Sequence, residues 1–306
     1  MRYKPSAWLL IFAVAGLCGL AVWGVALYRS RNLTAGALMR RIPIDENALV
    51  LYVDFAALRQ AGVLQLLDGS KLAEEPDYQA FVRKTDFDYR QDLDSALVAF
   101  ATSGRYLLLK GRFDWRSLRA YVESQEGHCY NSFCQMDGSS AERHISFFPL
   151  QTNLMAMAVS PDSSAALRLQ SVGPPLPDVP RAAVWLSIPP SVLKARDDLP
   201  GGTRMFARGI EAAQSVILTV APEGQRLAAR LDVRCGSEQD ATAAAAALTS
   251  ATGTLREAIE REHQKPNPAD FSGVLTSGTF RSDGLRVYGF WPIERAFISN
   301  VLGGGS

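Results

Sequence analysis

Histidine is scarce in this sequence, and net charge is almost absent. Three of the 306 residues are histidine, at positions 128, 144 and 263, and no two have the four-residue spacing of a zinc-protease helix. The formal net charge is +1, from 32 basic and 31 acidic side chains. Because a nucleic-acid-binding protein needs a basic surface, this balance disfavours nucleic acid as a partner.

Familiar catalytic and cofactor motifs are also missing. The sequence contains no glycine-rich phosphate loop of the Walker or dinucleotide kind and no G-x-S-x-G nucleophile motif. Aspartates recur in TDFDYRQDLD at 85–94, but this stretch lacks the central glycine and final glutamate of a calcium loop. We therefore predict no catalytic residue, no cofactor and no metal site, and we expect that the protein is not an enzyme.

One long apolar run lies near the N-terminus. Residues 7–28, AWLLIFAVAGLCGLAVWGVALY, carry no charge, and about 20 apolar residues are enough to cross a bilayer core of about 30 Å. The alternative is a cleaved signal peptide, whose apolar region is shorter, about 7–15 residues, and ends at a small-residue site. We predict a transmembrane helix at 7–28 in contact with lipid, a cytoplasmic segment at 1–6 and a juxtamembrane connector at 29–41.

Two cysteines decide the expected orientation of that helix, because basic residues flank both of its ends and the positive-inside rule gives no direction. Cys129 and Cys134 bracket YNSF, a stretch that suits a short turn between strands, where facing side chains can form a disulfide. Two free thiols, or a metal site with His128, are the alternatives. Since a lasting disulfide needs an oxidising compartment, we predict a single-pass protein of a bacterial inner membrane with an extracytoplasmic body.

The remainder of the chain predicts an α+β body in two halves. Hydrophobic residues make up 47% of the sequence and charged residues 21%, a balance typical of a chain with a packed core. The proline-rich stretch SVGPPLPDVP at 171–180 predicts a linker between a first module at 42–170 and a second at 181–303, followed by a flexible tail at 304–306.

The two halves show the same order of elements, β-α-β-β-α-β-β-α. Strands are expected at 49–55, 96–101 and 106–113 in the first half, and at 183–188, 215–220 and 226–233 in the second. Helices capped by Asp114 and Ser237 follow, and each half closes with a hairpin, at 145–159 and 273–290, and a helix. This order predicts a duplicated module of mostly antiparallel sheet with helices packed on one face. A single α+β domain without a repeat is the alternative.

Aromatic pairs in the two closing hairpins indicate an interaction surface. Phe147 and Phe148 are adjacent, as are Phe290 and Trp291, so each pair places one ring on each face of its strand. A ring on a face that no helix covers would form a binding patch.

Three functions remain open at this stage. The favoured one is a non-enzymatic, membrane-anchored protein that binds or scaffolds another envelope protein. The second is a ligand-binding or sensing module with its site between the halves. The third is a hydrolase that uses carboxylates brought together by the fold.

Overall fold

The computed structural model describes residues 34–67, 75–138, 140, 143–174, 179–194, 201–224 and 226–302. The predicted cytoplasmic segment at 1–6, the predicted transmembrane helix at 7–28 and the predicted tail at 304–306 lie outside these residues. Within the described ranges, no helix has the length and apolar character needed to cross a membrane.

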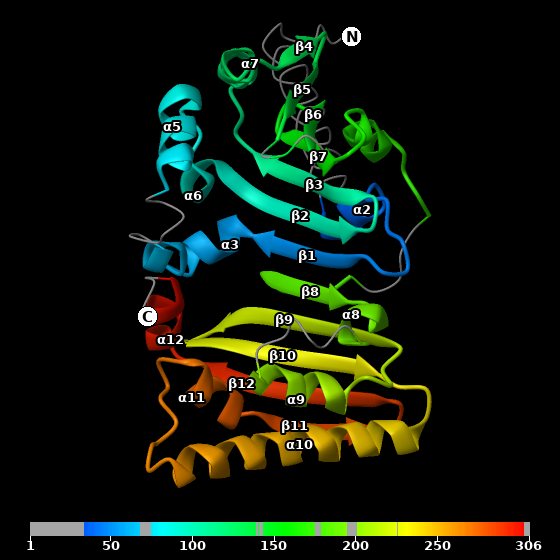
Figure 1. Ribbon diagram of the computed structural model, residues 1–306, viewed down its shortest axis with the longest axis vertical. Coiled ribbons are helices and arrows are strands. Elements are labelled where there is room, and N and C mark those ends of the chain that lie inside the picture. Colours follow the sequence, from blue (N-terminus) through cyan, green and yellow to red (C-terminus); the bar gives the residue numbers. More distant parts are fainter. Residues whose placement is uncertain are drawn as a thin grey trace, which may run out of the picture.

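The described strands form one twelve-stranded antiparallel sheet that runs the length of the molecule (Figure 1). The strand order is β11-β12-β10-β9-β8-β1-β2-β3-β7-β6-β5-β4. The strands are β1 Leu49–Asp54, β2 Leu93–Ala101, β3 Gly104–Gly111, β4 His128–Tyr130, β5 Phe133–Asp137, β6 His144–Gln151, β7 Leu154–Ser160, β8 Val184–Ile188, β9 Ser215–Glu223, β10 Arg226–Arg234, β11 Thr279–Asp283 and β12 Arg286–Ile293.

Short helices connect most of the strands. One long helix, α10, lies beside β11 at the outer end of the second half (Figure 1). The described helices are α2 Ala35–Met39, α3 Phe55–Gln60, η1 Leu64–Leu67, α5 Pro76–Thr85, α6 Tyr89–Asp92, α7 Trp115–Ser124, η2 Ala165–Gln170, α8 Pro190–Lys194, α9 Gly201–Gly209, α10 Glu238–Arg261, α11 Phe271–Thr276 and α12 Arg295–Leu302. As the sequence predicts, Asp114 caps α7 by accepting from the amide of Arg116, and Ser237 caps α10 by accepting from that of Asp240.

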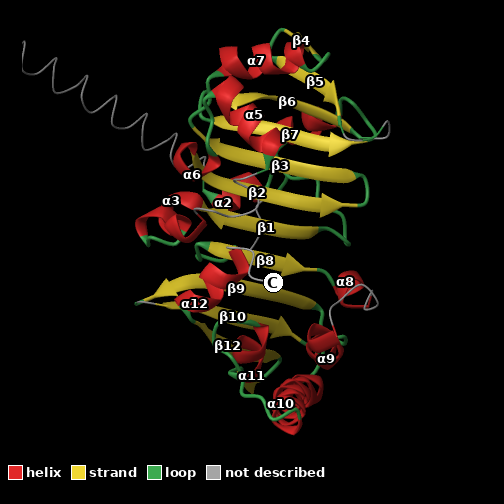
Figure 2. Cartoon of the chain, turned by 60° about the vertical axis from the view of Figure 1, so that its left-hand side comes forward, coloured by secondary structure: helices red, strands yellow, loops and turns green. Residues whose placement is uncertain are grey.

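β1 and β8 join the two halves at the middle of the sheet, where both views show them side by side (Figures 1 and 2). They pair antiparallel from Val50 opposite Ser187 to Val53 opposite Val184. Strands extend outward from this junction in the orders β1-β2-β3-β7-β6 and β8-β9-β10-β12-β11. The mixed helix-and-strand fold with a large antiparallel sheet is therefore confirmed.

Helices pack on both faces of the sheet in the first half, which corrects the prediction of helices on one face. The strand register places the partners of α7, α9 and α10 on the same face of the sheet. On the opposite face, α2 and η2 pack over β2, β3 and β7 through Leu38 and Leu169. These apolar side chains are removed from water only because the second face of the first half is covered.

Part of the stretch predicted as a connector, 29–41, is folded, because α2 begins at Ala35. Thr34 caps α2 by accepting from the amide of Ala37, and Leu38 is fully buried. Arg40 donates from Nε to the carbonyl of Gly173, 2.9 Å away, and its own carbonyl accepts from the Gly173 amide. The beginning of the expected linker at 171–180 is therefore bound to the end of α2.

The second closing hairpin is shorter than the predicted range of 273–290. Asp270 accepts from the amide of Ser272 at 2.7 Å and starts α11, which contains Gly273. The hairpin consequently begins at Thr279, after this helix has ended.

Trp185 is the large side chain that covers the junction between the halves. Its ring stacks on Tyr52 of β1 with 5.6 Å between centroids, and it is 1% exposed. We expect Trp185→Ala to lower the free energy of unfolding by about 3–5 kcal/mol, because it leaves a cavity in the core. The matched surface variant Leu167→Ala, at a position that is 42% exposed, should change it by less than about 0.5 kcal/mol. Urea denaturation measures both values, and equal losses would contradict this role of Trp185.

Asp88 should contribute to the acid sensitivity of the fold. Burial by itself would raise the pKa of Asp88, but hydrogen bonds from Arg90, one of them 2.7 Å long, outweigh burial and hold this pKa below its usual value. A carboxyl whose pKa is lower in the folded state stabilises the protein above its unfolded pKa of about 3.9, and this contribution is lost as the pH falls through the folded pKa. The melting temperature of the Asp88→Asn variant should therefore fall less than that of the parent protein between about pH 6 and about pH 3. Thermal melts at both pH values test this, with the exposed Asp283→Asn as the surface control.

Candidate functional site

Three of the four aromatic residues proposed for an interaction surface are buried. Phe147 is 5% exposed, Phe148 7% and Trp291 8%. As expected, Phe147 and Phe148 lie on opposite faces, but α7 packs on the first and η2 on the second. Trp291 packs under α9 and α10. These three residues therefore stabilise the core and form no surface patch, because helices cover every face on which they lie.

Among the described residues, Phe290 lies on the sheet face opposite the one on which α9, α10 and α11 pack, and we call it the open face. We define the open face by one set of side chains from β9 to β12: Ile217, Thr219, Arg230, Asp232, Thr279, Arg281, Tyr288 and Phe290. The helices that pack on these strands, α9 to α11, all contribute to the core on the opposite side. The register aligns the open face in two rows, one from Thr219 to Thr279 and one from Ile217 to Arg281.

Arginines lie over aromatic rings on the open face. The guanidinium carbon of Arg230 is 5.8 Å from the centroid of Phe290, and that of Arg281 is 4.8 Å from the centroid of Tyr288. Such a contact is worth about 0.5–1 kcal/mol at an exposed site. Each arginine keeps donors available for a partner, since its fork carries five N–H groups.

Acidic side chains partly balance these cations. Arg230 donates to Glu223 at 2.7 Å, and Arg281 lies 4.0 Å from a carboxylate oxygen of Asp283. Asp232 of the open face lies 3.2 Å from Arg286. A shallow cavity of about 300 Å³ lies between Arg230, Arg281, Tyr288 and Phe290. The open face thus combines apolar rings, cations and a small depression, a composition that protein interfaces favour.

Strand alternation is the sequence signal that could have located this face. In β10, Ala229, Leu231 and Val233 are buried, whereas Arg230 and Arg234 are exposed and Asp232 is half-buried. Ala228, near the start of the strand, is also buried, so the alternation holds from Ala229 to Arg234. Such alternation is typical of a sheet that faces water on one side. In β7, by contrast, the run LMAMAVS is apolar at almost every position and is covered on both faces. A comparison of strands by alternation would have placed the open face in the second half.

The expected cysteine pair is joined. Cys129 and Cys134 face each other across β4 and β5 and form a disulfide. Both sulfurs are therefore engaged, and His128 instead contacts the side chain of Gln135 at 2.9 Å. Among the described residues, no three side chains of His, Cys, Asp or Glu are grouped as a metal site would need. Cys235 is a free thiol buried in the second half, where burial raises its pKa.

Comparison with known proteins yields similarity of shape alone. No family model matches the sequence, and no curated protein matches it. Three solved structures, crystal forms I, III and IV of TP0453, are similar at TM-scores of 0.44–0.45 and 10–13% identity. The alignments cover 83–84% of this chain and 92–94% of the other. At these scores the likeness carries no argument about function.

Proposed function

We propose that this protein is a non-enzymatic binding protein, anchored by residues 7–28 in a bacterial inner membrane, whose extracytoplasmic body binds another envelope protein. The observation that carries the proposal is the open face, where Arg230 and Arg281 lie over Phe290 and Tyr288. Arginine and aromatic residues are the types most enriched among interface residues that dominate binding energy. The exposed guanidinium groups favour a partner segment that presents carboxylates, because the arginine fork pairs with a carboxylate through two hydrogen bonds.

The symmetry of the strand order supports a duplicated module within this proposal. Strands extend from β1 and from β8 in corresponding order, and η2 and α12 follow the corresponding strands β7 and β12. η2 packs on the sheet of the first half, whereas α12 contacts η1 and, through Phe297, Phe271 of α11. In the proposed repeat, one copy would therefore have kept a helix on this face and the other would have left it open for binding.

The two other candidate functions receive less support. A ligand site between the halves would have to lie at the junction, but backbone pairing of β1 with β8 joins the halves there. A hydrolase would need converging carboxylates. The carboxylates of Asp114, Asp162 and Asp270 instead accept hydrogen bonds from nearby serines, which hold the pKa of each below its usual value.

Site-specific photo-crosslinking in intact cells tests the binding face. A photoreactive amino acid at Tyr288 should give a discrete protein adduct, whereas the same group at Ala247 on α10 should not. In the Tyr288 background, the double change Arg230→Glu and Arg281→Glu should lower the adduct yield by about tenfold or more, because it places negative charge against the partner's carboxylates. The matched control Arg261→Glu, on an exposed position of α10, should leave the yield unchanged. Equal adducts from Tyr288 and Ala247, or no effect of the double change, would sink the proposal.

Thiol labelling tests the proposed compartment. In intact cells, a membrane-impermeant thiol reagent should label the half-buried Cys129 only after reduction, because an extracytoplasmic disulfide blocks its sulfur. Cys134, which is 1% exposed, and Cys235, which is 2% exposed, should stay unlabelled until the protein is unfolded, and Cys235 serves as an internal control. A free thiol at Cys129 that reacts only after cell lysis would place the body in the cytoplasm.

A further inference from the structure

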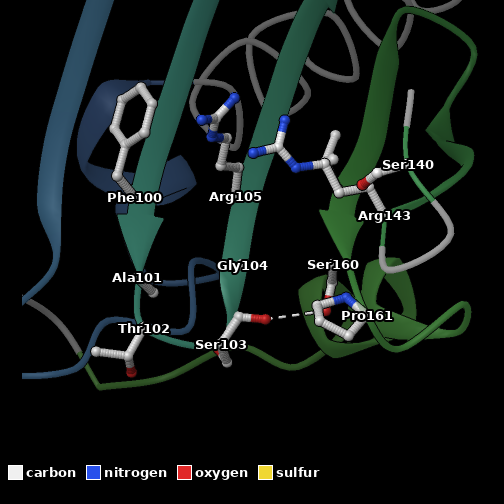
Figure 3. Close-up of a pocket in the computed structure, with 11 residues that line it drawn as sticks. Phe100, Ala101, Thr102, Ser103, Gly104, Arg105, Ser140, Arg143, Ser160 and Pro161 are labelled. Carbon is white, nitrogen blue, oxygen red and sulfur yellow. Dashed lines mark hydrogen bonds between the residues drawn. The ribbon is translucent and has the colours of Figure 1, made fainter. Parts of the chain in front are cut away.

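A second cavity lies in the first half, on the face of the sheet that carries α7. It has a volume of about 550 Å³ and opens beside the turn between β2 and β3, the segment before β6 and the end of β7. Figure 3 shows its lining residues. A cavity of this volume lies within the range that holds small organic ligands, about 300–1,000 Å³. It belongs to neither the open face nor the disulfide hairpin.

Two arginines, Arg105 and Arg143, line this cavity. Figure 3 shows the guanidinium group of Arg143 extending toward that of Arg105, which lies between Arg143 and Phe100. Arg105 also lies over the Phe100 ring, with 5.8 Å from its guanidinium carbon to the ring centroid. Within the described part of the chain, no carboxylate lies within ion-pair distance of Arg105 or Arg143, while other arginines such as Arg112 and Arg168 have acidic partners. Two neighbouring cations repel each other, and an anion placed between them would relieve this repulsion.

The floor of the cavity is fixed by hydrogen bonds. Ser160 donates from Oγ to the carbonyl of Ser103 at 2.9 Å, the dashed line in Figure 3. Thr102 donates both its amide and its hydroxyl to Asp45, which holds the turn against the segment before β1. Gly104, at φ 143°, lies so close to β7 that a Cβ there would be 2.8 Å from the carbonyl oxygen of Val159. These contacts hold the turn against β7 and the segment before β1, and so fix one wall of the cavity.

An apolar wall completes the site. Phe100, near the end of β2, is 39% exposed, and Val159 lies in the same row of the register. An aromatic ring beside guanidinium groups can stack on the flat part of a ligand whose charged group pairs with the cations.

We propose that this cavity binds a small organic oxyanion, a phosphate or carboxylate attached to a flat apolar group. The oxyanion lies between Arg105 and Arg143, and the apolar group packs against Phe100. The site is separate from the proposed protein-binding face, so each proposal can fail without the other.

Calorimetric titration of the purified full chain with phenyl phosphate tests the site. Phenyl phosphate should bind at submillimolar concentration, more tightly than inorganic phosphate, and the neutral analogue benzyl alcohol should not bind. Arg105→Gln and Arg143→Gln should each weaken phenyl phosphate binding about tenfold or more, because each removes a charge-assisted hydrogen bond. Phe100→Ala should weaken binding of phenyl phosphate while leaving inorganic phosphate unaffected. Arg261→Gln on α10 is the matched control, and unchanged melting temperatures show that the variants are folded.

The oxyanion could belong to a lipid headgroup or to a free small molecule. Competition with lipid vesicles distinguishes these two sources. Displacement of phenyl phosphate by phosphatidylglycerol vesicles, and not by phosphatidylcholine vesicles, would assign the site to a lipid headgroup. Failure of both vesicles to displace it would assign the site to a free anion. The proposal is overturned if phenyl phosphate does not bind, or if it binds equally to the parent protein and to the two arginine variants.

Discussion

Backbone hydrogen bonds between β1 and β8 turn two short sheets into one. Without this pairing, β1 and β8 would each expose an apolar edge strand, and such edges pair readily with other chains. The antiparallel ladder satisfies their amide and carbonyl groups, and Trp185 stacks on Tyr52 over it. Because the sheet continues through the junction, each of its two faces runs across both halves. The placement of the helices then determines which parts of each face reach solvent.

Helix placement differs between the halves, and the surface chemistry follows from it. α2 and η2 cover the second face of the first half, so that face is filled with residues such as Leu97, Tyr106 and Leu108. The corresponding face of β9 to β12 lies opposite the helices α9, α10 and α11 and carries arginine, aspartate and threonine beside two aromatic rings. The same strand geometry therefore produces a core in one half and a candidate binding face in the other.

Arginine is the common element of the two candidate sites, but its setting differs. On the open face, Arg230 lies over a ring on a broad surface and already donates to Glu223. Arg105 and Arg143 line one cavity beside the β2–β3 turn, and no carboxylate among the described residues pairs with either of them. A broad face with partly balanced charge suits a protein partner, whereas a confined pair of cations suits a small anion.

The sequence alone was sufficient for the local elements of this fold. β-branched and aromatic runs marked β1 and β8, the Asp114 and Ser237 caps marked the starts of α7 and α10, and the short spacing of Cys129 and Cys134 predicted their bond. These features depend on residues close to one another in the chain. Tertiary structure alone decided that the halves share a sheet, that Phe147, Phe148 and Trp291 are buried, and that Arg105 and Arg143 line one cavity. The physical reason is that a strand's pattern shows which side chains share a face, while the elements packed against that face come from distant parts of the chain.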